Sequence, residues 1–506
     1  MTAAEPLPER AQSPHVYYGA TKSLCATCKQ GLDARVVFRD GGVWLLKRCP
    51  DHGAQECLIS SSVDWYLDAL SFVAPHTPPR TVAKEVRQGC PFDCGPCSSH
   101  QQKVYLPVIP ITSACNLDCP ICYTINKNED PHQLSLEAMQ GILDHLAREH
   151  DDLDIINFTG GEPTLHPQLP EILRMCREAG IRRLTVSTNG LRLKDEAYVE
   201  VLAEAGIRVV LSLDSFEREV DLALLGADTT RLKLEVIDLL EKHDVPTTIL
   251  PAVALGLNDR EVPRLFELVV SRPHLLSLEL HTLCFTGQGG VGFGRDARIT
   301  VPDLHARIEE ASQGRITPAD FVPSPLAHPH CYSICYMLVL DDGGYVPFTR
   351  LMSRQTLFEL LQDSLYIEPR ARLEAVFRDM IDDLWADPDR LPEADQVLAT
   401  LKRLLRQMFP PRGDVSLDER RRIAERSCKA VYIHSHMDEE SFDVSRIMKC
   451  CVGVPEPDGT NIPTCSYNVL YRERDPRFAD AAARERLDAA RPGGRPLPVV
   501  AGEVRA

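Results

Sequence analysis

Residues 115–122 read Cys115-Asn116-Leu117-Asp118-Cys119-Pro120-Ile121-Cys122 and follow directly on the apolar run 105–112. They present three thiols at Cys-x3-Cys-x2-Cys spacing on one short loop. Cysteine thiolates are the usual ligands of iron–sulfur clusters, which normally take four protein ligands. Three thiols would leave one iron of a cubane open to a substrate or cofactor, so the loop is a candidate reaction centre. A zinc loop or a chance grouping is the alternative, although the spacing is not a standard zinc pattern.

Downstream of this loop, strand-like runs alternate regularly with amphipathic helical stretches. Strands are expected at 105–112, 154–159, 183–187, 208–213, 247–253 and 276–283, and helices at 134–148, 169–179, 194–205, 230–243 and 260–271. Such alternation implies a parallel sheet. Six right-handed units predict an incomplete (β/α)6 TIM-like barrel in the α/β class. Sites in such barrels lie at the carboxyl ends of the strands, where the Cys115 loop would stand.

Glycines and polar residues also follow the next three expected strands. They are Gly160, Gly161, Glu162 and Pro163 after the second strand, Ser187 and Asn189 after the third, and Ser212 and Asp214 after the fourth. Two adjacent glycines let the backbone approach a ligand closely. Each segment alone has an ordinary explanation as a turn or a helix cap. Together, at successive strand ends, they indicate a pocket for a polar cofactor.

The cysteine trio, segment 160–163 and the β/α units resemble the radical S-adenosylmethionine (SAM) enzymes, over about residues 105–290. The resemblance implies that Cys115, Cys119 and Cys122 hold a [4Fe–4S] cluster whose fourth iron is chelated by SAM. It implies that segment 160–163 contacts the SAM amino group. It further implies that the ribose and carboxylate are lined by Ser187, Asn189, Ser212 and Asp214. Enzymes of this family cleave SAM reductively to a 5′-deoxyadenosyl radical that abstracts hydrogen. One departure is Ile121, where the family often has an aromatic residue, although Tyr123 follows closely.

A separate metal site is expected near the N-terminus. Cys25-x2-Cys28 and Cys49-x2-His52 flank two short strand-like runs joined by a hairpin signal at 40–42. The two knuckles would meet at the base of the hairpin as three sulfurs and one nitrogen, as in zinc ribbons and rubredoxin-like modules. The sequence predicts one mononuclear iron or zinc there. Cys57 is an alternative to His52 as fourth ligand.

Two further cysteine groups are expected to hold one or two auxiliary [4Fe–4S] clusters. Cys90, Cys94 and Cys97 repeat the spacing of the Cys115 loop, but no barrel strand precedes them, and a second zinc site is the alternative. The C-terminal region offers Cys428, Cys450 and Cys465, with Cys331 as a further candidate. Neighbouring side chains diverge, so only one of Cys450 and Cys451 is expected to be a ligand, and Cys450 is preferred.

The composition favours a cytoplasmic metalloprotein. Hydrophobic residues make up 44% of the 506 residues, enough for a large core, and the net charge of −17 makes nucleic acid a poor default partner. No apolar run is long enough for a membrane span, and no secretory signal is recognisable. In a reducing compartment, eighteen cysteines, most of them clustered, indicate metal binding rather than disulfides.

The expected domain layout follows from these groups. It comprises a disordered lead (1–20), a Cys-rich hairpin module (21–62), a linker with the Cys90 loop (63–103), the barrel core (104–295), a mostly helical C-terminal extension that binds a cluster (296–475) and a flexible tail (476–506).

The order of the cysteine motifs over about residues 20–475 resembles the archaeal tetraether lipid synthases and the related pterin-methylating radical enzymes. The resemblance implies C–C bond formation or alkylation, with a ferredoxin or flavodoxin as electron donor. It favours coupling of lipid chains as the reaction. Radical methylation of a pterin is one alternative, and a non-catalytic electron-transfer protein is another. A long apolar tunnel would favour a lipid substrate, whereas a small polar pocket with carboxylate and amide groups would favour a pterin.

Overall fold

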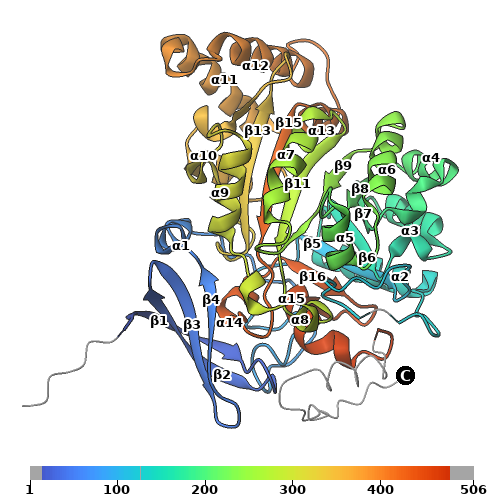
Figure 1. Cartoon of the computed structure of the whole chain (residues 1–506). Coiled ribbons are helices and arrows are strands. Elements are labelled where there is room, and N and C mark those ends of the chain that lie inside the picture. The colour runs from blue at the N-terminus through green and yellow to red at the C-terminus, as the bar shows by residue number, and fades with distance from the viewer. Residues whose placement is uncertain (1–13, 126, 479–506) are drawn as a thin grey trace, which may run out of the picture.

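The computed structural model describes residues 14–125 and 127–478. The N-terminal part is a four-stranded antiparallel sheet in the order β1-β2-β3-β4, followed by helix α1 (Figure 1). These elements are β1 Val16–Leu24, β2 Gly31–Arg39, β3 Gly42–Cys49, β4 Gly53–Ser60 and α1 Val63–Leu70. The expected hairpin is β2–β3, which turns at Asp40 and Gly41, both with positive φ. Residues 16–20, expected in a disordered lead, instead form strand β1. Residues 1–13 and 479–506 lie outside the described residues.

The centre of the protein is an α/β unit whose parallel strands follow the sequence order β5, β6, β7, β8, β9 and β11. These strands and the short β10 are β5 Leu106–Thr112, β6 Ile155–Gly160, β7 Arg183–Thr188, β8 Arg208–Leu211, β9 Thr247–Ile249, β10 Ala252–Val253 and β11 Leu275–Thr282. The helices of this unit are α2 Leu136–Glu149, α3 Leu169–Glu178, α4 Glu196–Glu204, α5 Arg218–Leu225, α6 Thr230–Lys242, α7 Val262–Ser271 and α8 Gly289–Gly292. The expected α/β alternation is confirmed. The run 247–253 is divided into β9 and β10, and α5 was not anticipated.

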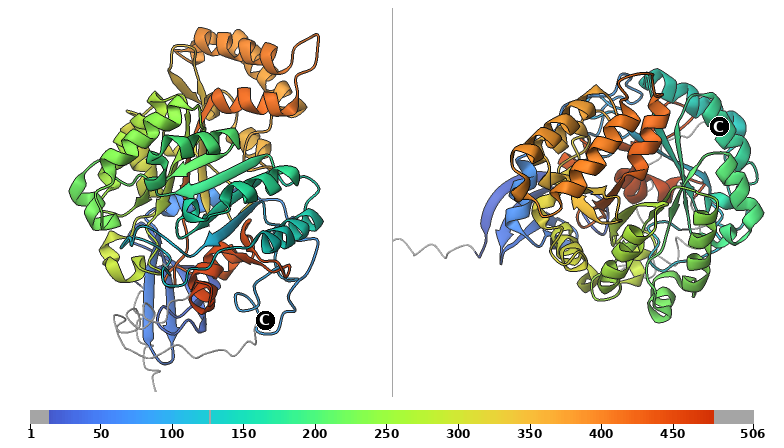
Figure 2. Two further views of the ribbon diagram at one scale, coloured as in Figure 1. Left: turned by 90° about the vertical axis from the view of Figure 1, so that its right-hand side faces the viewer. Right: turned by 90° about the horizontal axis from the view of Figure 1, so that it is seen from above.

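Successive side chains along a strand point to opposite faces of the sheet. One face packs against the helices in the hydrophobic core, and the other faces the interior of the unit. Ile156 and Phe158 of β6 are fully buried in the main hydrophobic core, whereas Asn157 lines a cavity on the other side of the strand. The covering helices form a ring around the outside of the sheet (Figure 2, right). Burial of each large apolar side chain contributes roughly 1.5–3 kcal/mol, so the outer face holds the unit together. The inner face is left available for polar side chains.

The C-terminal extension adds strands at both ends of the central sheet as well as helices. Its strands are β12 Val322–Pro323, β13 Tyr332–Val339, β14 Tyr345–Pro347, β15 Cys428–His434, β16 Val452–Pro455 and β17 Asn461–Pro463. Its helices are α9 Val301–Ala311, α10 Arg354–Leu360, α11 Ala371–Ala386, α12 Ala394–Met408, α13 Leu417–Arg426, α14 Val444–Ile447 and α15 Thr464–Ser466. Strand β15 pairs in parallel with β11, and β16 pairs in parallel with β5.

Strand β13 was not predicted because it is buried along nearly its whole length. A continuous apolar run lacks the alternation that distinguishes a strand from a buried helix. Within the residues that are placed, no helix is both long and apolar enough to cross a membrane.

Candidate functional site

The Cys115 loop stands at the carboxyl end of β5 and is held by bonds from several segments. The Cys115 N–H donates to Asn128 Oδ1 at 2.9 Å, and the Gly289 N–H donates to the Cys122 carbonyl at 2.9 Å. On the side of α5, the Ile121 N–H donates to the Leu224 carbonyl at 3.1 Å. The loop is therefore a fixed part of the fold at the edge where barrel enzymes carry their sites.

The chemistry of this loop fits a cluster with three protein ligands. Cys115, Cys119 and Cys122 are half-buried free thiols. Burial, together with the charges of Glu162 and Cys122, raises the pKa of the Cys115 thiol to about 12. Burial and the other two thiols likewise raise the pKa of Cys119. Three thiolates that repel one another in a partly buried loop require positive charge, which a bound iron–sulfur cluster supplies.

Gly160 and Gly161 allow β6 to pass against the backbone of the cysteine loop. A Cβ on Gly160 would lie 2.2 Å from the Thr112 carbonyl oxygen, and one on Gly161 would lie 2.2 Å from that of Ala114. The N–H groups of Gly161 and Glu162 donate to the same two carbonyls, at 2.8 and 2.7 Å. The paired glycines thus let the end of β6 lie against the backbone at the end of β5 and the start of the cysteine loop.

Glu162 ties the end of β6 to the end of β7. Its fully buried carboxylate accepts hydrogen bonds from Thr164 N and Oγ1, from Thr188 Oγ1 at 2.7 Å and from Asn189 N at 2.8 Å. Burial raises the pKa of Glu162, although these donors oppose the rise. Because its oxygens are occupied inside the protein, Glu162 positions the neighbouring loops.

The remaining predicted cofactor residues lie along the same edge. Asn189 reaches the cysteine loop, because its Nδ2 donates to Asn116 Oδ1 at 2.8 Å. The Ser212 N–H donates to the Thr188 carbonyl at 3.0 Å. Asp214 is buried and accepts from the Ala252 N–H at 2.8 Å, and burial raises its pKa. Pro163 begins a buried turn after Glu162.

Lys233 of α6 was missed by the sequence analysis. Its side chain is completely buried, and its Nζ has no hydrogen-bond partner within the described part of the chain. The ammonium lies close enough to lower the pKa of both Cys119 and Asp214 electrostatically. A buried, unpartnered ammonium is costly unless an anion joins it. Lys233 is therefore placed to meet a negatively charged cofactor group.

A cavity of about 250 Å³ runs through the interior of the sheet toward this edge. Its wall includes Thr159, which directly precedes Gly160, and Tyr123, which directly follows Cys122. At the far end, Arg208 pairs with Glu425, and Tyr336 and Tyr432 share a hydrogen bond of 2.6 Å. The cavity thus extends from the cysteine loop to a charged and aromatic floor.

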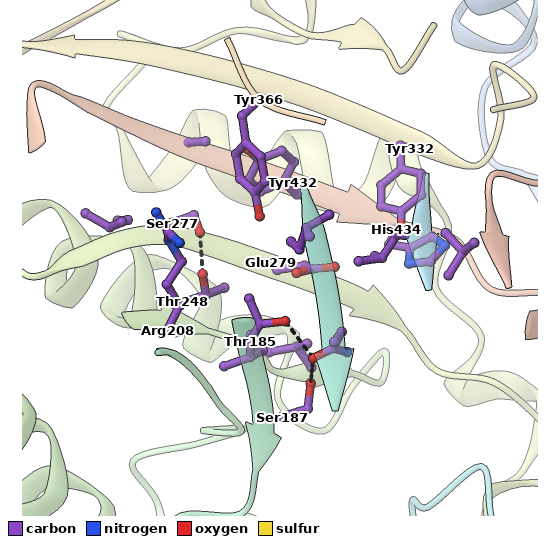
Figure 3. A pocket seen from close by; sticks show the side chains of 18 of the residues that line it. Thr185, Ser187, Arg208, Thr248, Ser277, Glu279, Tyr332, Tyr366, Tyr432 and His434 are labelled. Atoms are coloured by element: carbon purple, nitrogen blue, oxygen red, sulfur yellow. Dashed lines mark hydrogen bonds between the residues drawn. The ribbon is translucent and has the colours of Figure 1, made fainter. Parts of the chain in front are cut away.

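Polar groups converge on the middle of the cavity (Figure 3). The side-chain oxygen of Asn157, Oδ1, accepts from the hydroxyls of Thr185 at 2.9 Å and Ser187 at 3.0 Å. Ser187, predicted to line the ribose, is therefore part of the cavity wall and orients Asn157. From β11, Glu279 accepts a hydrogen bond from His281 Nε2 at 2.9 Å through one carboxylate oxygen. Its other oxygen has no donor among the residues described, so a carboxylate and an amide face the same space.

The N-terminal sheet brings the four predicted metal ligands together. Cys25, Cys28, Cys49 and His52 each offer a ligand atom, and these atoms lie within 4.8 Å of one another. His52 Nδ1 is 3.6 Å from Cys25 Sγ and 3.4 Å from Cys49 Sγ. Cys57 instead donates to the Leu58 carbonyl and lies apart from this group. The donor set of three sulfurs and one nitrogen fits a tetrahedral ion.

The auxiliary thiols form two neighbouring groups on either side of α14. Cys90, Cys94 and Cys97 line one small cavity with Ile447 and Met448. Cys331, Cys450 and Cys465 line another with Arg446. Cys450 interacts electrostatically with both Cys331 and Cys465, whereas Cys451 does so with Cys331. Cys451 lines the same cavity, so the preference for Cys450 stays a prediction.

Cys428 does not join these groups, contrary to the prediction. It begins β15 and donates to the Ala424 carbonyl at 2.9 Å. Cys331 lies beyond the opposite end of the same strand, where its carbonyl accepts from the Ser435 N–H. Seven extended residues separate the two ends, about 20 Å at 3.3 Å per residue.

Comparison with known proteins agrees with this arrangement. Residues 109–269 match the Radical SAM superfamily, and residues 17–61 match the HMPTM N-terminal zinc ribbon domain. The chain is 28% identical to 7,8-dihydro-6-hydroxymethylpterin dimethyltransferase of Methanocaldococcus jannaschii over 487 residues, which cover 90% of this chain and 94% of that protein. It is 33% identical to GTP 3′,8-cyclase of Chlorobaculum tepidum over 178 residues, which cover 35% of this chain and 52% of that protein.

A solved structure of Streptococcus suis SuiB bound to S-adenosylmethionine aligns with a TM-score of 0.35 and 18% identity, covering 42% of this chain and 48% of that one. The superfamily match spans the strands that carry Glu162 and Asn189 and includes Cys115, Cys119 and Cys122. Residues 109–269 are therefore a radical SAM domain.

Proposed function

We propose that this radical SAM enzyme methylates or otherwise alkylates a pterin ring held in the interior cavity. The observation that carries the proposal is that the Glu279 carboxylate and the Asn157 amide both line a cavity of about 250 Å³, whose wall also includes residues next to the cysteine loop. A pterin presents adjacent ring N–H and amino donors, which one carboxylate can accept together, and a ring carbonyl, which an amide N–H can meet. The full-length similarity to a named pterin dimethyltransferase supports the same substrate class.

Coupling of lipid chains, which the sequence resemblance favoured, is not supported. A lipid chain offers no partner for a buried carboxylate or for imidazoles, and such groups cost free energy when they are left unpaired beside hydrocarbon. The cavity wall carries Glu279 together with His281, His434 and several hydroxyls. A small polar heterocycle satisfies these groups, whereas an acyl chain does not.

The chain's own residues would hold the cofactors and exclude water. Cys115, Cys119 and Cys122 would hold the [4Fe–4S] cluster, and Lys233, Asn189, Ser212 and Asp214 would surround the SAM site. When bound, these cofactors supply a 5′-deoxyadenosyl radical by reductive cleavage of SAM. Tyr123 and Thr159 form the part of the cavity wall next to the loop, so a ring in the cavity would lie beside the reactive centre. Enclosure by the sheet shields both from solvent.

The other thiol groups would serve electron transfer. The sets Cys90, Cys94, Cys97 and Cys331, Cys450, Cys465 would hold auxiliary clusters between the N-terminal sheet and the cavity, with a ferredoxin or flavodoxin as the external donor. The N-terminal site, Cys25, Cys28, Cys49 and His52, would hold a single zinc or iron with a structural role.

Binding of 7,8-dihydro-6-hydroxymethylpterin to the anaerobic holoenzyme tests the substrate assignment. Replacing Glu279 by Gln removes a charged acceptor, and a charge-assisted hydrogen bond contributes about 1.5–3 kcal/mol. The dissociation constant should therefore rise roughly 10- to 100-fold. Glu267→Gln, at an exposed position of α7, is the matched control and should bind normally. Equal binding by both variants, or preferential binding of a lipid extract, would overturn the proposal.

A further inference from the structure

Three histidines from adjacent strands converge in the cavity wall. His281 is near the end of β11, and the parallel register with β15 pairs it directly with His434. His436 follows two residues later. One ring nitrogen from each histidine lies within 4.8 Å of the other two, and the ring centroids are 3.9 to 5.1 Å apart. Figure 3 shows His434 next to Tyr332.

The surroundings of this histidine group leave ring nitrogens unused. His434 stacks on Tyr332 with ring centroids 3.8 Å apart, and its imidazole makes no hydrogen bond to any described residue. His436 directs Nδ1 toward Cys465 Sγ at 3.8 Å, which leaves Nε2. His281 directs Nε2 toward Glu279 at 2.9 Å, which leaves Nδ1. Each ring thus keeps at least one nitrogen without a hydrogen bond among the described residues, and one ligand shared by the three rings would satisfy them.

Three converging imidazoles beside a carboxylate suit a metal rather than an anion. A neutral imidazole is the form that ligates metals. The hydrogen bond from His281 to the Glu279 carboxylate is the outer-shell contact that commonly orients a metal-binding histidine. The carboxylate also supplies negative charge beside the site.

We propose that His281, His434 and His436 bind one divalent transition-metal ion, with its open coordination positions facing the cavity. Imidazole ligands suit zinc and ferrous iron, and three protein ligands with one open position are typical of catalytic zinc. Zinc–nitrogen bonds are about 2.0–2.1 Å long, so the three rings would rotate slightly toward one another when a metal binds. The open position would take an oxygen or nitrogen atom of the substrate and polarise it. That role rests on the proposed function, whereas the metal site itself does not.

Zinc uptake by the cluster-loaded enzyme tests the site. The protein is stripped with a chelator, dialysed against Zn²⁺ alone, and its zinc and iron contents are measured. The double variant His434→Gln/His436→Gln should bind about one zinc ion per chain fewer than the wild type, with unchanged iron. His145→Gln, which alters a buried histidine of α2 away from the cavity, should retain the wild-type zinc content. Equal zinc in the double variant and the wild type would overturn the proposal.

X-ray absorption at the zinc edge of the wild-type protein gives an answer even if the double variant misfolds. The N-terminal site alone would give a first shell of mostly sulfur at about 2.3 Å. A second site made of histidines adds nitrogen or oxygen neighbours at about 2.0–2.1 Å, so these should outnumber sulfur. A shell that remains dominated by sulfur at full zinc loading would contradict the histidine site. Neither measurement depends on pterin turnover, so failure of the metal site and failure of the proposed function are distinguishable.

Discussion

Asn189 Nδ2 donates a hydrogen bond to Asn116 Oδ1 at 2.8 Å and so joins the end of β7 to the cysteine loop after β5. The Asn189 N–H also donates to Glu162, which lies after β6. Three successive strand ends are thereby connected around the expected cofactor site. The loop that carries the thiols is thus held in part by a side chain from a neighbouring unit.

Removal of this link should slow SAM cleavage without loss of iron. A neutral hydrogen bond contributes about 0.5–1.5 kcal/mol, so Asn189→Ala should reduce the rate of 5′-deoxyadenosine formation roughly 2- to 10-fold. Asn116→Ala should have a similar effect, and the double variant should be no slower than the slower single variant. Additive effects in this double-mutant cycle would show that the two residues act independently.

Lys233→Met should weaken SAM binding. The ammonium is buried without a hydrogen-bond partner among the described residues and lies near the buried Asp214 carboxylate, so the substitution removes a cation from the SAM site. We expect the SAM dissociation constant to rise at least about tenfold, which is 1.4 kcal/mol. Lys242→Met alters an exposed lysine of the same helix and should leave the SAM affinity unchanged. An unchanged SAM affinity in Lys233→Met would remove this residue from the site.

Glu162→Gln should destabilise the protein, because an amide replaces two acceptor oxygens by one acceptor and one donor group. The carboxylate accepts several buried hydrogen bonds, so the free energy of unfolding should fall by about 2–4 kcal/mol. Thermal denaturation of the cluster-loaded protein measures this change, with the exposed Glu171→Gln as control. A melting temperature equal to that of the control would mean that these bonds contribute little.

Arg298 and Asp438 form a buried ion pair. Burial opposes ionisation of Asp438, but Arg298, at 3.1 Å, and donors from Ser441 and Phe285 lower its pKa to about 2. A depressed carboxyl pKa stabilises the fold above the unfolded value of about 3.9, and this contribution is lost as the pH falls toward 2. Arg298→Met leaves a buried carboxylate unpaired and should cost about 3–5 kcal/mol at neutral pH.

The deficit of Arg298→Met should shrink as the pH is lowered, because protonation of Asp438 removes the unpaired charge. Thermal denaturation from neutral pH to the most acidic pH that the clusters tolerate measures it, with Arg295→Met, at a more exposed site, as control. A deficit that is constant with pH would argue against the ion pair.

The sequence predicted the central unit well because each strand and helix of 105–283 carries its own periodic pattern. It did not predict that β15 and β16 extend the central sheet, because pairings between distant segments leave no local signal. Two functional residues that were not predicted did leave a local signal in the sequence. Lys233 lies on the buried face of α6 with Val236, Ile237 and Leu240, and a lysine on an apolar face is exceptional.

The second missed residue, Glu279, has its signal in the alternation of β11. Ser277, Glu279 and His281 share one face of the strand, while Leu278 and Leu280 occupy the other. Alternation of this kind indicates a polar interior. Cys428 was assigned wrongly to the auxiliary cluster because spacing along the chain does not show which end of a strand a thiol occupies.

Radical chemistry on a pterin is tested most directly by the products formed when the anaerobic, cluster-loaded enzyme is given reductant, SAM and 7,8-dihydro-6-hydroxymethylpterin. We predict that the pterin accelerates formation of 5′-deoxyadenosine and that Cys115→Ala abolishes it. Absence of 5′-deoxyadenosine while the Cys115 cluster is spectroscopically intact would contradict radical chemistry. Acceleration by lipid but not by the pterin would contradict the proposed substrate.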